Sequence, residues 1–373
     1  MNYKATLLAI SLWQCSLLFS QVKSADPDTS IFSRWANILR AKKELTYIGI
    51  GPWVVNGKGE VPVLLEDQIR QDFLLFSGRS NQIPFIRSLI FNFDLGLNMR
   101  MYQGLENPSY PIRPMNFMPA FSLYYLLNQF KFSIPDLAFL YNNDLKDFYT
   151  LKITLSHFSN GQSGNFYNYD SSNSNRRDGN FSTNFLKSEF SWSRFLNDHL
   201  LSASLNYQRD FGIGNLLGFA EGLEKSYGKN RIGTSLIFHS KNLKSGYYRY
   251  KKVDFQNSDS IAENKRALIL KSRQHYKRYT SIKIRYDTEY ILGDLSNYPT
   301  QKKPSFVKNR FSQKFTLSIY PANGRTPGFF FLLYYGRDYY NICYTDKILN
   351  FKTGLLFELN KYVSPNTVYI PSR

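Results

Sequence analysis

The chain has 373 residues, of which 43% are hydrophobic and 17% aromatic, and its formal net charge is +19. Outside the N-terminus it contains no apolar run of about 18 residues, which excludes helical membrane spans. The basic residues are scattered among alternating segments behind an export signal. They therefore indicate contact with the phosphates of lipid headgroups or lipopolysaccharide, and we expect no nucleic-acid binding.

Residues 1–24 are predicted to be a cleaved secretory signal peptide. Lys4 supplies the positive start, residues 5–19 form the apolar region, and residues 22–24 offer a cleavage site. The apolar region is too short to span a membrane as a helix. Cys15 lies within this signal, so Cys343 is the one cysteine left after cleavage and an intrachain disulfide is excluded.

Residues 25–88 have a mixed pattern that predicts an N-terminal extension. Ile31 to Leu45 has the spacing of a short amphipathic helix, and Gly49 to Val63 is rich in glycine. We expect this extension to be periplasmic and to pack near the barrel or partly inside it.

Residues 89–373 consist of segments in which apolar and polar positions alternate. The clearest segment runs from Phe91 to Tyr102, where apolar residues at odd positions alternate with residues that include Asp94 and Arg100. Further strands are predicted at about residues 116–127, 149–159, 184–192, 201–211, 231–239, 246–252, 267–276, 281–291, 311–320, 329–335 and 349–357. About a dozen such segments fit a soluble β-sandwich poorly. They predict an all-β fold, a transmembrane antiparallel β-barrel of about 12 strands in a bacterial outer membrane.

Two of these strands carry side chains that could form a hydrolytic site. His157 and Ser159 continue the apolar series that includes Leu155, so they share one face of their strand. Asn184 shares a face with Leu186 in the next strand, and on a membrane barrel these apolar faces contact lipid. A hydroxyl, an imidazole and an amide can serve as nucleophile, general base and orienting group. His-x-Ser in an isolated strand is seldom catalytic, so the coincidence of all three residues carries the prediction.

The residues around this face resemble the outer membrane phospholipase A family. Residues 157–161 read His-Phe-Ser-Asn-Gly and residues 182–184 read Ser-Thr-Asn, which matches the family's His-x-Ser-Asn-Gly and its Ser-x-Asn in the following strand. Upstream, residues 111–119 resemble the family's Pro-Phe-Arg-x-x-Asn-Tyr-x-Pro loop. The resemblance covers residues 90–357, and its motifs are specific around these two loops.

That family has a twelve-stranded barrel, a site on the barrel exterior near the outer leaflet, and calcium-dependent phospholipase activity. The resemblance implies that Ser159 is the nucleophile, His157 the general base and Asn184 the residue that orients the imidazole. It also implies that the Gly161 amide donates to the oxyanion. We therefore predict a serine phospholipase of A1/A2 type that acts on membrane phospholipids.

Calcium is the cofactor that the resemblance implies. The backbone carbonyl of Gln162 and the side chain of Asn180 stand where the family has ligands, although the family has arginine and serine there. Ser109 resembles a loop hydroxyl that the partner subunit supplies in the family, which also implies a homodimer. The insertion between Gln162 and Asn180 is much longer than in the family pattern.

Two other functions compete with this prediction. A lipid A deacylase also uses His-x-Ser on a barrel exterior, but it is expected to have a carboxylate orienter and a smaller barrel. Glu189 is the carboxylate near Asn184, and it lies on the opposite strand face. A porin or structural barrel without enzymatic activity would have the same polar inward residues, and a wide water-filled lumen would support it.

Overall fold

The computed structural model describes most of the predicted strands and the segment that precedes them. It describes residues 23–24, 35–36, 38–39, 41–56, 59–60, 63–78, 84–102, 115–131, 147–165, 179–196, 199–212, 227–240, 281–293, 295, 310–321, 327–340 and 347–357. Ser109, residues 1–22 of the predicted signal peptide, and the predicted strands at 246–252 and 267–276 lie outside the described residues.

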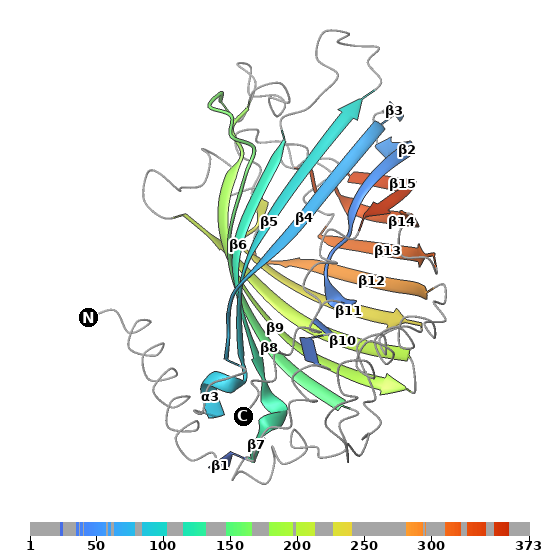
Figure 1. The fold of residues 1–373 in the computed structure, drawn as a ribbon. Helices are drawn as coiled ribbons and strands as arrows, with labels where there is room; N and C mark the ends of the chain where they lie inside the picture. The colour runs from blue at the N-terminus through green and yellow to red at the C-terminus, as the bar shows by residue number, and fades with distance from the viewer. Residues whose placement is uncertain are drawn as a thin grey trace, which may run out of the picture.

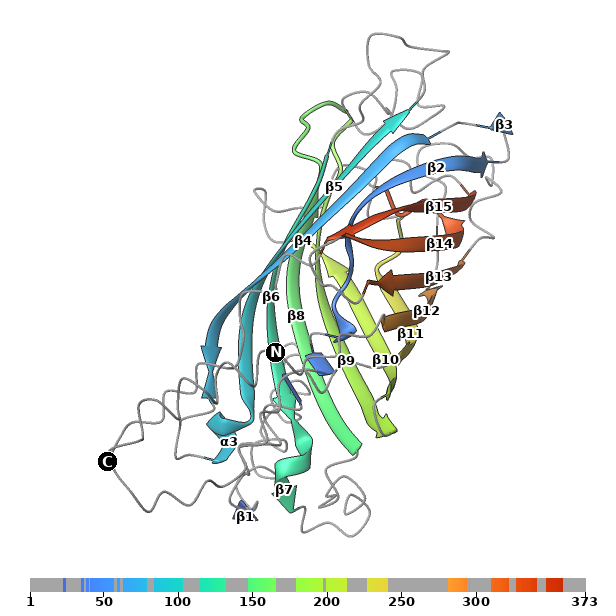
Figure 2. The ribbon, with the colours of Figure 1, turned by 45° about the vertical axis from the view of Figure 1, so that its right-hand side comes forward.

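The described strands form one antiparallel sheet that closes into a barrel (Figures 1 and 2). They are β2 (Thr46–Asn56), β3 (Gly59–Glu60), β4 (Val63–Ser77), β5 (Leu89–Tyr102), β6 (Asn116–Leu126), β8 (Asp147–Ser159), β9 (Ser182–Leu196), β10 (His199–Phe211), β11 (Asn230–His239), β12 (Ser281–Leu292), β13 (Phe311–Tyr320), β14 (Gly328–Arg337) and β15 (Lys347–Phe357). Twelve of these described strands make the wall, and the two-residue β3 pairs with the end of β2. The prediction of a twelve-stranded all-β barrel is therefore confirmed.

Four short elements lie next to this sheet. β1 (Lys23–Ser24) pairs with β7 (Phe130–Lys131), α3 (Pro84–Arg87) connects β4 to β5, and the 3-10 turn η2 (Leu127–Gln129) follows β6. Within the described residues, no helix is long and apolar enough to cross a bilayer.

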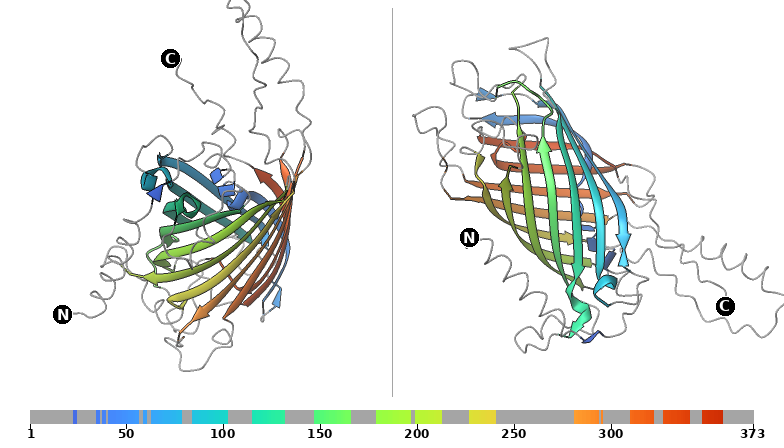
Figure 3. Two further views of the ribbon diagram at one scale, coloured as in Figure 1. Left: turned by 90° about the horizontal axis from the view of Figure 1, so that it is seen from below. Right: turned by 90° about the vertical axis from the view of Figure 1, so that its left-hand side faces the viewer.

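Pairing of β15 with β2 closes the wall (Figure 3). The register runs from Phe357 opposite Thr46 to Ile348 opposite Asn56, with one irregularity between Phe351 and Thr353. Closure gives the backbone N–H and C=O groups of these two strands partners across the seam. A sheet inside a bilayer requires such pairing, because hydrocarbon offers no hydrogen bonds to a free edge.

The barrel is apolar outside and polar inside. Along β8, Thr150, Thr154 and Ser156 are buried, whereas Ile153 and Leu155 on the other face are 40% and 45% exposed. Exposed apolar residues recur on the outer face of the other wall strands, which is the reverse of a soluble protein. A lipid-facing surface explains this distribution, so the barrel points to the bacterial outer membrane.

Several buried charged side chains inside the barrel form ion pairs. Arg100 is fully buried, and its guanidinium contacts Glu66 at 2.8 Å and Asp338 at 2.7 Å. Lys352 is also fully buried and forms an ion pair with Glu66. Such pairing is necessary, because removing one partner would leave an uncompensated charge inside the wall.

The segment before β2 lies inside the barrel. Residues 35, 36, 38, 39, 41 and 42 are helical. The indole nitrogen of Trp35 donates to Thr150 Oγ1 at 2.9 Å, and Lys42 forms an ion pair with Glu189 at 2.8 Å. The Lys42 carbonyl accepts from Arg285 at 3.0 Å. Since Thr150, Glu189 and Arg285 belong to three wall strands, this segment fills part of the lumen. Of the two predicted positions for the extension, near the barrel or partly inside it, the structure shows the second.

The predicted boundary between extension and barrel at residue 88 is wrong, because β2 and β4 are wall strands. The alternation of β2 is hidden by glycine: Ile48 and Ile50 face outward, and Gly49 faces the lumen where the Phe330 ring occupies the space of a side chain. A Cβ on Gly49 would lie 2.8 Å from that ring. Gly49 therefore permits close packing inside the barrel and does not mark a loop.

This correction also changes which strands make up the twelve. The sequence count included segments at 246–252 and 267–276, which lie outside the described residues. In the structure β11 pairs directly with β12, and β2 and β4 supply the two remaining wall strands. The predicted total is confirmed, but its membership is different.

Replacement of Trp35 should test whether the segment before β2 stabilises the barrel. Trp35 is fully buried against Thr150 and a cluster of apolar side chains. We expect Trp35→Ala to lower the free energy of unfolding by about 3–5 kcal/mol. Trp35→Phe should lower it by about 1 kcal/mol, because one hydrogen bond is lost. The temperature at which the barrel unfolds in detergent, read by heat-dependent migration in SDS gels, should fall in that order. Equal unfolding temperatures for all three proteins would contradict packing of Trp35 in the lumen.

Candidate active site

The three predicted catalytic residues lie on the outer face of two neighbouring strands. In the register of β8 and β9, His157 lies opposite Asn184 and Ser159 lies opposite Ser182. Leu155 and Leu186, which form the next outward pair, are 45% and 44% exposed. The structure therefore brings His157 and Asn184 together beside the apolar surface, as strand parity predicts.

A hydrogen bond joins the imidazole of His157 to the side chain of Asn184. His157 Nδ1 lies 2.9 Å from Asn184 Oδ1, and Asn184 Nδ2 donates to the Phe211 carbonyl at 3.4 Å. Because a carbonyl only accepts, this arrangement directs the amide oxygen of Asn184 towards the imidazole. His157 then carries its proton on Nδ1, which leaves the Nε2 lone pair as a proton acceptor.

Ser159 is on the same face as His157, at the last position of β8. It is partly exposed and lies opposite Phe117 of β6, whose ring is 37% exposed. The pairing of β6 with β8 omits His157, and Pro119 stands opposite it in register. Proline has no N–H to donate, so it interrupts the ladder beside the imidazole.

The backbone after Ser159 turns at Gly161. Its φ of +65° lies in the left-handed region that glycine adopts without steric cost. Asn160, just before it, is 1% exposed and joins the two ends of the β8–β9 connection. Its Nδ2 donates to the Gly179 carbonyl at 2.7 Å, and its Oδ1 accepts from the amides of Gln162 at 3.2 Å and Phe181 at 3.0 Å. Asn160 thus holds the predicted oxyanion residue next to the start of β9.

The structure brings together the segments that contain two of the three predicted calcium ligands. The amide of Asn180 donates to the Gly164 carbonyl at 2.7 Å, and Gly164 and Gly179 form a β-bridge. Gln162 and Asn180 therefore flank one small junction. Both would offer oxygen atoms, which is the donor element that calcium prefers. Among the described residues there is no group of three or more His, Cys, Asp or Glu side chains suited to a metal.

Sequence reasoning missed the partners that fix these residues in place. The Phe211 carbonyl comes from β10, and a strand pattern contains no signal for such a contact. Phe181 is fully buried and packs against Phe158, with ring centroids 4.8 Å apart. Tyr227 also packs against Phe181, with ring centroids 5.5 Å apart. Burial raises the pKa of the Tyr227 hydroxyl above its ordinary value. The site is therefore backed by aromatic side chains on the inner side of the wall.

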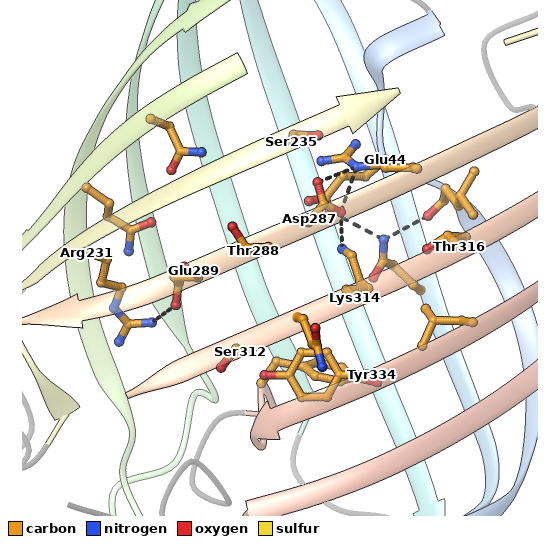
Figure 4. Close-up of a pocket in the computed structure, with 18 of the residues that line it drawn as sticks. Glu44, Arg231, Ser235, Asp287, Thr288, Glu289, Ser312, Lys314, Thr316 and Tyr334 are labelled. Atoms are coloured by element: carbon orange, nitrogen blue, oxygen red, sulfur yellow. Dashed lines mark hydrogen bonds and ion pairs between the residues drawn. The ribbon is translucent and has the colours of Figure 1, made fainter. Parts of the chain in front are cut away.

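Glu189, the carboxylate weighed as another orienting group, faces the lumen. It pairs there with Lys42, and its strand position is opposite in parity to Asn184. It also lines a lumen cavity of about 340 Å³ (Figure 4) and a neighbouring one of about 320 Å³, both bordered by Lys43 and Glu44 of the inner segment. Glu189 therefore lies on the opposite side of the wall from His157.

No protein-family model and no curated protein sequence matches the chain. Among solved structures, it resembles outer membrane phospholipase A from Escherichia coli, with 11% identity, coverage of 85% of this chain and 93% of that chain, and a TM-score of 0.46. It also resembles the Salmonella typhi outer membrane phospholipase, described as a dimer with bound calcium, with 12% identity, 84% and 90% coverage, and a TM-score of 0.44.

A third similar structure is the Pseudomonas aeruginosa protein OccK5, with 9% identity, coverage of 83% of this chain and 62% of that chain, and a TM-score of 0.30. Identities and TM-scores in this range concern the barrel and do not assign an activity to this chain. The functional case therefore rests on the residues of the site.

Asn160→Ala should loosen the junction beside Gly161 without unfolding the barrel. The substitution removes three hydrogen bonds of a buried side chain, each worth about 1 kcal/mol. Hydrogen–deuterium exchange followed by mass spectrometry should show faster exchange at the amides of Gln162 and Phe181, whereas β12 to β15 should be unchanged. Ser163→Ala, at an exposed neighbouring position, is the control. Unchanged exchange at both amides would show that Asn160 does not hold the junction.

Proposed function

We propose that this protein is an outer-membrane phospholipase that hydrolyses acyl esters of membrane phospholipids through Ser159, His157 and Asn184. The observation that carries the proposal is the 2.9 Å hydrogen bond between His157 Nδ1 and Asn184 Oδ1 on the lipid-facing surface, with Ser159 on the same face of β8. If this imidazole–amide pair lay in the core of a soluble protein, its role in packing and hydrogen bonding would be enough to explain it. At the border of an apolar outer surface, the partly exposed Ser159 hydroxyl beside this pair would be accessible to lipid.

The proposed reaction proceeds through an acyl-enzyme. Ser159 Oγ attacks the ester carbonyl carbon while its proton passes to His157 Nε2. The imidazolium keeps its Nδ1–H on Asn184, and the Gly161 amide donates to the oxyanion. His157 then protonates the departing lysophospholipid alcohol as the C–O bond breaks. It next takes a proton from water as that water attacks the carbonyl carbon of the acyl-Ser159 ester. His157 returns this proton to Ser159 Oγ as the ester C–O bond breaks, and the fatty acid leaves.

The low dielectric of the membrane surface supports this assignment. Electrostatic contacts to the oxyanion are stronger where water is scarce, so one amide donor contributes more there than in an aqueous site. Asn184 offers His157 a dipole and no charge, so it orients the imidazole well and stabilises the imidazolium less than a carboxylate would. Substrate would reach Ser159 by lateral diffusion in the outer leaflet.

Calcium and a second subunit belong to the same proposal. Gln162, through its carbonyl, and Asn180 would hold calcium beside Gly161, and Ser109 of the partner subunit would complete the shell. When bound, calcium supplies positive charge and a polarised water near the oxyanion. These are neutral ligands, so the affinity should be weak, in the range of about 0.1–1 mM typical of extracellular calcium modules.

Cleavage of residues 1–24 would precede insertion into the outer membrane.

Substitution of the nucleophile gives the direct test. Ser159→Ala and His157→Ala should each lower hydrolysis of phosphatidylethanolamine in mixed micelles by at least about 1,000-fold, because each removes a group that takes part in bond formation. A fluorophosphonate should label Ser159 in the wild type. Ser188→Ala, an exposed serine on the outer face of β9, is the matched control and should keep wild-type activity. Full activity of Ser159→Ala would exclude this nucleophile.

The choice of substrate separates this proposal from a lipid A deacylase. Fatty acid release should be fast from phosphatidylethanolamine and slow from purified lipid A. Faster release from lipid A would assign the same residues to the other reaction. A protein that hydrolyses neither lipid and is not labelled at Ser159 would be a porin or a structural barrel.

Removal of calcium tests the proposed cofactor. Excess EDTA should abolish phospholipid hydrolysis, and added calcium should restore it with a half-maximal concentration in the submillimolar to millimolar range. Asn180→Ala should raise that concentration several-fold, because one oxygen ligand is lost. Calcium-independent hydrolysis by the wild type would remove the metal from the mechanism and leave the roles of Ser159 and His157 intact.

A further inference from the structure

We propose that Asp210 is a positioning residue for Asn184, acting from inside the barrel through Thr183 and Phe211. This inference rests on the proposed function, because it concerns the state of the same histidine. Asp210 lies on the inner face of β10 and is 1% exposed, so it touches neither lipid nor substrate. From the inner face of the wall it can influence how Asn184 is held on the outer face.

Asp210 is connected to both partners of the hydrogen bond that orients Asn184. Its Oδ1 accepts from Thr183 Oγ1 at 3.3 Å, and Thr183 immediately precedes Asn184. The same hydroxyl lies 3.3 Å from the Asn184 carbonyl. On the other side, Asp210 immediately precedes Phe211, whose carbonyl accepts from Asn184 Nδ2. One carboxylate therefore ties together the ends of β9 and β10 where the orienting amide is held.

Asp210 is itself fixed by several contacts in the lumen. Gln208 Nε2 donates to its Oδ2 at 3.1 Å, and its own amide donates to the Lys229 carbonyl at 2.7 Å. Arg231 lies 3.6 Å from the carboxylate and forms an ion pair with Glu289 at 3.0 Å (Figure 4). A buried carboxylate with these partners has little freedom to move.

The same group of side chains also reaches the strand that carries the nucleophile. The Arg231 guanidinium lies 4.0 Å from the centre of the Tyr227 ring, and Tyr227 packs against Phe181. Phe181 packs against Phe158, the residue between His157 and Ser159. Contacts inside the barrel thus run from Asp210 to the backbone of β8 as well as β9.

The consequence of moving Asp210 is chemical, because the amide of Asn184 sets the tautomer of His157. The bond from Asn184 Nδ2 to Phe211 is long, at 3.4 Å, so a small shift of β10 would break it. The amide could then rotate and present its NH₂ group to His157 Nδ1. The imidazole would carry its proton on Nε2, where it could no longer accept the proton of Ser159.

The experiment compares Thr183→Val and Asp210→Asn with a matched control on the same two strands. Ser193 and Ser202 form a buried hydroxyl pair across β9 and β10 at 2.8 Å, away from the site. Ser193→Ala therefore removes an equivalent hydrogen bond. Thr183→Ser, which keeps the hydroxyl, should restore wild-type behaviour.

The first readout is the tautomer of His157, which does not depend on any activity. The chain has only four histidines, so selective ¹⁵N-histidine labelling with His157→Gln for assignment resolves the signal. We expect Nδ1–H in the wild type, Ser193→Ala and Thr183→Ser, and a mixture that includes Nε2–H in Thr183→Val and Asp210→Asn. An unchanged tautomer in both of the latter variants would overturn the inference, whether or not the protein hydrolyses phospholipids.

The second readout is kinetic. The comparison uses variants whose unfolding temperature equals that of the wild type. In these, Thr183→Val should lower kcat and the rate of fluorophosphonate labelling by about 10- to 100-fold and leave KM within twofold of the wild-type value. Ser193→Ala should change none of these three quantities. In an Asn184→Ala background, Thr183→Val should cause no further loss, since it acts through Asn184. Multiplicative losses in the double variant would contradict a positioning role. A further outcome is that the wild type shows neither hydrolysis nor labelling while the variants still show the expected tautomer shift. That outcome would reject the phospholipase proposal and leave the positioning role in place.

Discussion

Closure of the sheet by β15 and β2 is the constraint on which the rest of the structure depends. A strand edge in a bilayer has no water to satisfy its backbone, so the chain must bring its first and last wall strands together. Closure also gives every wall strand an inner and an outer face. Because side chains alternate with a period of two residues, a single register then decides which residues meet lipid and which meet the lumen.

The candidate site uses both sides of this wall. His157, Ser159 and Asn184 face outward at the border of the apolar surface. Behind Asn184, on the inner face, the Thr183 hydroxyl contacts the Asp210 carboxylate and the Asn184 carbonyl. A lipid-facing site cannot build a polar support on its own side, so the lumen supplies it.

The lumen is occupied by ion pairs and by the segment around Trp35 and Lys42, which contacts several wall strands. Its cavities of about 340 and 320 Å³ both border that segment. These contacts lie on the inner side of the wall, whereas the proposed site lies on its outer side.

The sequence determined the fold class and the face of the three site residues, because both follow from local alternation. His157, Ser159 and Asn184 could be placed on one surface from strand parity without any knowledge of the partner strands. Alternation did not reveal β2, where Gly49 leaves space for Phe330, nor β4, whose wall position only pairing with β2 and β5 establishes. The tertiary structure alone decided that β2 closes the barrel, that the Phe211 carbonyl orients Asn184, and that Asp210 lies behind them. These contacts join residues that are far apart in the chain, and their existence depends on register and closure, which no local pattern encodes.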